Sequence, residues 1–298
     1  MSFNFQISSF RFFGVCVCII IFQNVFMAQN TDCNFDEKTL QFVGKPIEQA
    51  RCLLRPNNIG GNLGDELKIL PKPLETIIGE KVMVKKDRLR KFLSDKKFNE
   101  NDLGGSLDEP LSTAKLPVGE EIYALYFIIH DTSTPYLKDE AFPKNFNSDK
   151  NWKGNNLEIW LKNPVAHVFV NRLGDSITTS LFSESAKKGF GTKFARDFLK
   201  ADAKGLQIHI ELVQPRRRDT KNKNPNNDLF APFPGFTAKQ YERLALLYVC
   251  ASVRRGSFLI PAYHSAIDAG IKDAHDDPQN FELEKFARAI EKLLKKLD

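Results

Sequence analysis

The chain has 298 residues, of which 42% are hydrophobic and 27% are charged. This apolar content is enough to form a buried core, which excludes a disordered tail and a disulfide-stapled mini-protein. The net charge of +6, from 43 Lys and Arg against 37 Asp and Glu, is small and dispersed, so no nucleic-acid partner is expected. A mean hydropathy of −0.34 excludes a membrane protein built from many spanning helices.

Near the N-terminal end, residues 12–22 form an unbroken apolar run (FFGVCVCIIIF) that follows Arg11. As a helix this run is too short to cross a hydrocarbon core of about 30 Å. It is typical of the apolar segment of a secretory signal peptide, with cleavage after Ala28; an uncleaved anchor or a buried helix is the alternative. We therefore expect residues 1–28 to be a signal peptide, export to the periplasm or the extracellular space, and no stable membrane anchor.

Three cysteines follow the expected cleavage site, namely Cys33, Cys52 and Cys250. An oxidising compartment permits disulfides, and a bond between Cys33 and Cys52 would close a short loop. Cys250 lies in an apolar helical stretch, so we expect it to be a buried free thiol.

Residues 29–118 form an N-terminal extension that contains no motif of known chemistry. We expect helices near 46–54 and 87–92, an extended segment at 70–74 because of its prolines, and a loop from 104 to 117. The extension either packs on the main domain or forms a small recognition module.

The main domain, residues 119–298, has sharper patterning. The predicted elements are strands at 122–130, 165–171, 176–181 and 205–213, a helix at 237–255 that opens with a capping box of Thr237 and Gln240, an extended segment at 258–261, and an amphipathic helix at 281–297. Strands interleaved with and followed by helices predict an α/β fold with a central mixed β-sheet flanked by helices.

All five histidines lie in this domain: His130, His167, His209, His264 and His275. Three of them, His130, His264 and His275, stand at the end of a predicted strand or in a loop after one. Two histidines from separate strand ends, with a carboxylate or a third histidine, are the ligands of an open catalytic zinc site. The alternative is that each histidine is an ordinary core or surface residue.

Glu211 lies in a predicted strand whose neighbours are apolar (IHIELV, residues 208–213). A carboxylate in a buried strand is unfavourable unless it is paired or serves a site. Strand alternation puts His209, Glu211 and Val213 on one face. Glu211 is therefore interpreted as a general base beside a metal ion, or alternatively as half of a structural ion pair with an Arg.

Six ordered motifs within residues 122–290 resemble the zinc-dependent N-acetylmuramoyl-L-alanine amidases, which include phage lysozyme-type amidases and peptidoglycan-recognition proteins. The motifs are FIIHDT (127–132), AHVFVNRLGD (166–175), IHIEL (208–212), FTAKQY (236–241), IPAYHSAI (260–267) and DPQNF (277–281). The resemblance implies that His130, His264 and Asp277 hold Zn²⁺, and that Glu211 is the catalytic glutamate.

The chain departs from the family pattern in the loop before Asp277, which is about three residues longer. This loop offers His275 and Asp276 as competing third ligands. The resemblance also implies that His275, or Lys272 nearby, stabilises the oxyanion, and it places Val168 where the family has Tyr.

The function implied is zinc-dependent hydrolysis of the amide bond between N-acetylmuramic acid and L-alanine, with the glycan strand and stem peptide of peptidoglycan as partner. The alternative is a non-catalytic peptidoglycan-binding module of the same fold. The basic segment of Arg216, Arg217 and Arg218, with Lys221 and Lys223 after it, either contacts stem-peptide carboxylates or, as we expect, forms a solvated charged loop. The sequence carries no signal for an oligomeric state.

Overall fold

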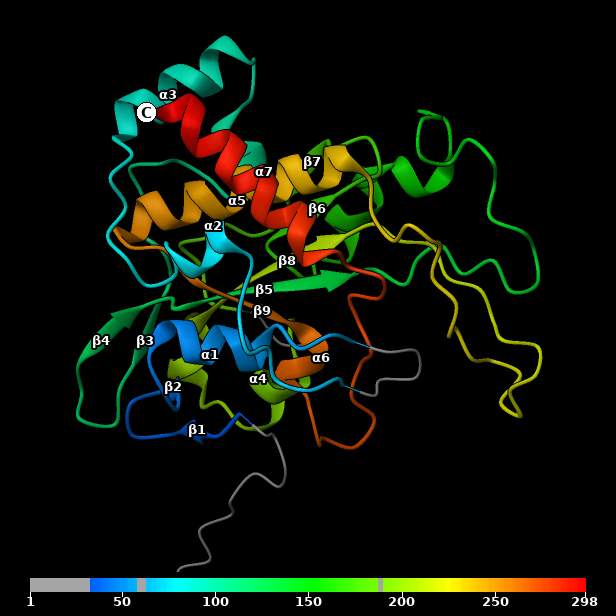
Figure 1. Cartoon of the computed structure of the whole chain (residues 1–298), viewed down its shortest axis with the longest axis horizontal. Helices are drawn as coiled ribbons and strands as arrows, with labels where there is room; N and C mark the ends of the chain where they lie inside the picture. Colours follow the sequence, from blue (N-terminus) through cyan, green and yellow to red (C-terminus); the bar gives the residue numbers. More distant parts are fainter. Residues whose placement is uncertain (1–32, 58–62, 187–189) are drawn as a thin grey trace, which may run out of the picture.

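The computed structural model describes residues 33–57, 63–186 and 190–298; the expected signal peptide lies outside them. Its centre is a five-stranded mixed sheet of order β7-β6-β8-β5-β9 (Figure 1), which confirms the predicted α/β fold class. The strands are β5 (Tyr126–Asp131), β6 (Val168–Val170), β7 (Ser176–Thr178), β8 (Gln207–Leu212) and β9 (Ile260–Tyr263). β5 is parallel to β8 and β9, β6 is parallel to β8, and β6 and β7 form the expected antiparallel hairpin.

The central strands β5 and β8 are buried at every residue. Strands are buried in this way because helices cover both sides of a parallel sheet. Helices α5 (Ala238–Arg255) and α7 (Leu283–Leu297) cover one side, and α1 (Pro46–Leu53), α4 (Lys193–Asp197) and α6 (His264–Ile267) lie on the other (Figure 1). The ends of the parallel strands are therefore held rigidly.

Helix α5 has the bounds that its sequence predicts. Thr237 Oγ1 accepts a hydrogen bond from the N–H of Gln240 at 3.1 Å, and the Gln240 side chain accepts one from the N–H of Thr237 at 3.2 Å. Gly256 ends the helix at a φ of 87°, a conformation that a residue without Cβ adopts freely. The predicted amphipathic helix is α7, which begins at Leu283 and buries Phe286, Ile290 and Leu293.

The described residues before 119 share one hydrophobic core with the sheet, including Leu53, Leu74 and Leu89. The Tyr126 hydroxyl of β5 donates to Gln49 Oε1 at 2.7 Å. The elements of this part are β1 (Phe35–Asp36), β2 (Gln41–Phe42), α1, α2 (Lys72–Glu75), α3 (Lys86–Asp95), η1 (Glu100–Leu103) and β3 (Thr113–Lys115). The division into domains at residue 119 stays a prediction.

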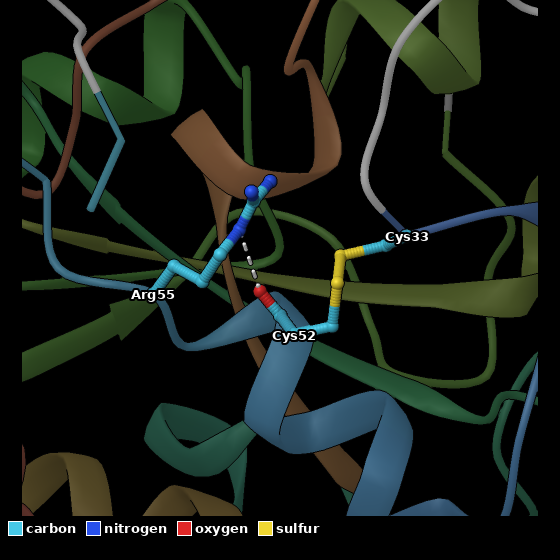
Figure 2. Close-up of a disulfide and its surroundings, with 3 residues drawn as sticks. All are labelled: Cys33, Cys52 and Arg55. Carbon is cyan, nitrogen blue, oxygen red and sulfur yellow. Dashed lines mark hydrogen bonds between the residues drawn. A yellow bond between two sulfur atoms is a disulfide. The ribbon is translucent and has the colours of Figure 1, made fainter. Parts of the chain in front are cut away.

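A disulfide joins Cys33 to Cys52 at the C-terminal end of α1, as predicted (Figure 2). Arg55 Nε donates a hydrogen bond to the Cys52 carbonyl at 3.1 Å (Figure 2). Cys250 is a buried free cysteine, as expected, and burial raises the pKa of its thiol to about 12. In the described part of the chain, no helix has the length and apolar character needed to span a bilayer.

The predicted strand at 122–130 is wrong as a single element. β4 (Glu121–Tyr123) pairs with β3 in a separate two-stranded sheet, and β5 begins only at Tyr126. The N–H of Ala124 donates to the Ser112 carbonyl, whereas the N–H of Leu125 donates to the Leu206 carbonyl. The backbone therefore changes partners between adjacent residues, and the continuous apolar run hides this change.

Two expectations for the extension are also wrong. Residues 72–75 form helix α2 because Pro71 is its N-cap and Pro73 lies in its first turn, where a missing N–H costs nothing. The expected loop at 104–117 contains strand β3, which pairs with β4. The remaining short helices are η2 (Lys153–Asn155), η3 (Leu157–Lys162) and η4 (Ala201–Leu206).

Candidate metal centre

The candidate site lies where three adjacent parallel strands end. His130 in β5 stands directly opposite Glu211 in β8. His264 is the first residue of α6, immediately after β9. Because β8, β5 and β9 run in the same direction, their carboxyl ends meet at one edge of the sheet and bring these side chains together.

His130, His264 and Asp277 form a buried cluster that could hold a metal ion, with ligand atoms within 4.8 Å of one another. His264 Nδ1 lies 2.9 Å from His130 Nδ1 and 2.9 Å from Asp277 Oδ1. His130 Nδ1 lies 3.7 Å from Asp277 Oδ2. These are the three residues that the resemblance implied as ligands.

The long loop before Asp277 places the carboxylate of Asp277, and not that of Asp276, against His130 and His264. The N–H of Asp131 donates to Asp277 Oδ2 at 3.1 Å. Asp276 instead accepts a hydrogen bond from Gln279 Nε2 at 2.6 Å and lies 3.6 Å from Arg216 Nη1. The position of the one carboxylate in the cluster is therefore set by a contact to the end of β5.

His275 lies at the exposed edge of the cluster. Its side chain is 61% exposed, and its Nδ1 is 3.9 Å from Asp277 Oδ1. Its ring stacks on that of His264 with a centroid separation of 4.9 Å. Lys272, the other predicted oxyanion donor, is exposed, and its carbonyl accepts a hydrogen bond from Lys193 Nζ. Val168 is buried in β6.

His264 is oriented by a carboxylate that sequence reasoning missed. Its Nε2 lies 2.8 Å from Asp268 Oδ2, and the Asp268 carboxylate also accepts from the N–H groups of Lys193 and Phe194, each at 2.8 Å. Burial alone would lower the pKa of His264, but Asp277 and Asp268 raise that pKa to about 10. A carboxylate behind a histidine ligand fixes the ring, and here it leaves Nδ1 facing the cluster.

The nitrogen of His130 that points away from the cluster faces another histidine. Its Nε2 lies 3.0 Å from His209 Nδ1. Burial, followed by the neighbouring histidines, lowers the pKa of both rings well below the usual 6.5. The sequence signal for this partner was the strand alternation that placed His209 on the same face as Glu211.

Glu211 is buried beside the cluster, and its Oε1 lies 3.9 Å from His130 Nδ1. Within the described residues its Oε2 has no hydrogen-bond partner, and no Arg forms an ion pair with it. Burial, with the Asp277 and Asp131 carboxylates nearby, raises the pKa of Glu211 well above 4.5. The alternative of a structural Arg pair therefore finds no partner in this part of the chain, and the side chain retains a free oxygen.

The basic segment departs from the expected solvated loop at its first residue, because Arg216 is fully buried, whereas residues 220–226 are exposed. Its Nη2 lies 2.6 Å from Asp131 Oδ2. Arg217 packs over the ring of Phe142 at 5.5 Å from the centroid. A buried charge needs a partner, and Asp131 provides it directly after His130.

Comparisons with protein-family models, curated proteins and solved structures found no match to this chain. The resemblance to the amidases therefore stays a prediction, which rests on the six ordered motifs. The geometry adds a buried His/His/Asp cluster and an adjacent carboxylate at the positions those motifs named.

Proposed function

We propose that this protein is a zinc-dependent N-acetylmuramoyl-L-alanine amidase that hydrolyses the bond between the glycan strand and the stem peptide of peptidoglycan. The observation that carries the proposal is the buried Glu211, which lies beside His130 and whose Oε2 has no hydrogen-bond partner among the residues that the structure describes. An ionisable group of perturbed pKa beside a metal-binding cluster is characteristic of a catalytic site.

The donor set fits zinc. Two imidazole nitrogens and one carboxylate oxygen are the ligands of open catalytic zinc sites, and Asp268 supplies the outer hydrogen bond to His264 that such sites use. When bound, the ion supplies Lewis acidity, which polarises a carbonyl group and lowers the pKa of a water molecule. His130, His264 and Asp277 would hold it.

Glu211 acts as the general base and then as the general acid. Its free carboxylate oxygen accepts a proton from the attacking water as the bond between the water oxygen and the amide carbon forms. The same proton passes to the nitrogen of L-alanine as the carbon–nitrogen bond breaks, so that a carboxylic acid and a free amine leave. Burial supports this role because it raises the pKa of Glu211 well above 4.5, which makes the carboxylate a stronger proton acceptor.

His275 is the proposed donor to the carbonyl oxygen of the substrate. It lies at the exposed edge of the buried cluster with its ring stacked on that of His264, so substrate can reach it. A single oxyanion donor contributes about 3 kcal/mol to transition-state stabilisation. Lys272 stays the second candidate for this role.

Export would place the enzyme where peptidoglycan lies. The disulfide between Cys33 and Cys52 supports this proposal, because disulfides persist in oxidising compartments and are rare in the cytosol. The proposed location is the periplasm or the extracellular space.

The deciding experiment measures release of stem peptide from purified peptidoglycan by wild type and by Glu211→Gln. The amide is nearly isosteric and accepts no proton, so we expect turnover to fall by about 10²–10⁴-fold with unchanged zinc content and no loss of thermal stability. Glu242→Gln is the matched control, because Glu242 is an exposed residue of α5 paired with Lys292. Equal activity of wild type and Glu211→Gln would remove Glu211 from the mechanism.

The same experiment decides the alternative function. A wild-type protein that contains zinc and binds peptidoglycan, but releases no peptide from any peptidoglycan type, would be a binding module of this fold. The proposed amidase activity would then be wrong.

A further inference from the structure

The five histidines of the chain form one continuous row of ring contacts. From the interior to the surface the order is His167, His209, His130, His264 and His275, with centroid separations of 5.8, 5.2, 4.5 and 4.9 Å. The proposed mechanism uses only the outer three. His209 and His167 are fully buried, and they lie behind His130.

The contacts of His130 and His264 define which nitrogen of each ring faces the cluster. His264 Nε2 is occupied by Asp268, and His130 Nε2 by His209. Both histidines therefore present Nδ1 to Asp277. A neutral imidazole that offers the Nδ1 lone pair to a metal carries its proton on Nε2, so His130 needs a hydrogen-bond acceptor at that position.

His209, whose Nδ1 lies 3.0 Å from that nitrogen, is held in place by contacts of its own. Its backbone N–H donates to His167 Nδ1 at 3.0 Å, and His167 Nε2 lies 3.1 Å from the Glu184 carbonyl. These two bonds leave His167 with a single consistent tautomer, with its proton on Nε2. The two hydrogen bonds hold β8 in place at His209, the residue that contacts His130.

The chain also clears space for the His209 ring. Gly191 has a φ of +76°, and a Cβ added there would lie 2.5 Å from His209 Cε1. A contact that short is not tolerated, so any larger residue at position 191 would displace the ring.

We propose that His209 is a positioning residue, whose Nδ1 accepts the hydrogen bond of His130 Nε2–H and so fixes the tautomer in which His130 Nδ1 faces His264 and Asp277. The role of His209 in metal binding rests on the proposed function. The tautomer itself is a property of the protein alone and is measured without metal.

The test compares His209→Asn with His209→Leu. The Asn Oδ1 stands where His209 Nδ1 stood and accepts a hydrogen bond, whereas Leu fills similar space and accepts none. Gln207→Leu is the matched control, because Gln207 is a buried polar residue two positions earlier in the same strand and bonds to Thr192 rather than to His130. This control shows how much zinc affinity is lost when β8 loses a buried polar side chain that does not contact His130.

Two measurements are made on each protein. Long-range ¹⁵N NMR of the metal-free protein identifies the protonated nitrogen of His130, and competition with a chelator gives the dissociation constant for Zn²⁺. We expect His130 to carry its proton on Nε2 in wild type. We expect a 10–100-fold loss of zinc affinity in His209→Leu, recovery to within a few-fold of wild type in His209→Asn, and little change in Gln207→Leu.

The outcomes separate this proposal from the proposed function. A wild type that binds no zinc overturns the amidase, while the His130 tautomer in that same protein still tests the role of His209. The positioning role is wrong if His130 carries its proton on Nδ1 in wild type. It is also wrong if His209→Leu binds zinc as tightly as wild type, or if His209→Asn is no better than His209→Leu. Should His209→Leu fail to fold, the wild-type tautomer and His209→Asn decide.

Discussion

The backbone N–H of Asp131 donates a hydrogen bond to Asp277 Oδ2 at 3.1 Å across 146 positions of sequence. The Asp131 side chain accepts from Arg216 Nη2 at 2.6 Å and from the N–H of Gln279 at 3.0 Å. The end of β5 thus holds the loop that carries Asp277, the carboxylate of the cluster. The position of Asp277 depends on an ion pair that lies behind it.

Removing Arg216 should therefore weaken both the fold and the metal site. Arg216→Met leaves Asp131 buried without its partner, which should lower the free energy of unfolding by about 3–5 kcal/mol, and we expect zinc affinity to fall with it. Denaturant unfolding in the presence of a chelator measures the first effect. Arg218→Met is the control, because Arg218 pairs with Asp139 at the surface and should change stability little. Equal stability of the two variants would contradict this account.

The cluster should bind about one zinc ion per chain. His264→Ala removes a nitrogen that two other ligand atoms face, so we expect zinc to be lost while the fold is mostly retained. His275→Ala should retain zinc because its ring stands at the exposed edge. Elemental analysis and far-UV circular dichroism measure these outcomes. Absence of zinc from wild type after zinc-replete purification would defeat the catalytic proposal.

Glu211 should make the metal-free protein less stable as pH rises. Burial raises the folded-state pKa of Glu211 well above 4.5, so folding favours the protonated form. Below pH 4.5 this stabilisation is fully present; it is lost as pH rises toward the folded-state pKa, by at most about 1.4 kcal/mol per pH unit. Relative to wild type, Glu211→Gln should therefore gain stability with rising pH. Denaturant unfolding of both proteins from pH 4 upward, with chelator, tests this; a difference that does not vary with pH would refute it.

The disulfide should contribute measurably to stability. Cys33 and Cys52 are 19 positions apart, and closing a loop of that length stabilises a fold by about 3 kcal/mol in the chain-entropy model. We expect reductant to lower the melting temperature of wild type and to leave a Cys33→Ser, Cys52→Ser double variant unchanged. Cys250→Ala is the control, because that thiol forms no disulfide. A wild-type melt that is insensitive to full reduction would show that the bond adds nothing.

Where neighbouring residues decide the structure, the sequence by itself was sufficient. The capping box of Thr237 and Gln240 predicted the start of α5, because both partners lie within one turn. The apolar runs predicted the strands of the parallel sheet. The ends of parallel strands share an edge, so His130, His264 and Glu211 were recognisable as candidates for one site.

Only the tertiary structure decided the contacts between distant residues. The run at 122–130 divides because β4 finds its partner in β3, and no local pattern encodes that choice. The sequence leaves His275 and Asp276 as competitors of Asp277 for the third ligand position, and the hydrogen bond from the N–H of Asp131 holds Asp277 at the cluster. The burial of Arg216 likewise depends on Asp131, 85 positions away. Periodicity indicates which face of an element is buried. A hydrogen bond across the fold depends instead on where two distant segments of the chain lie.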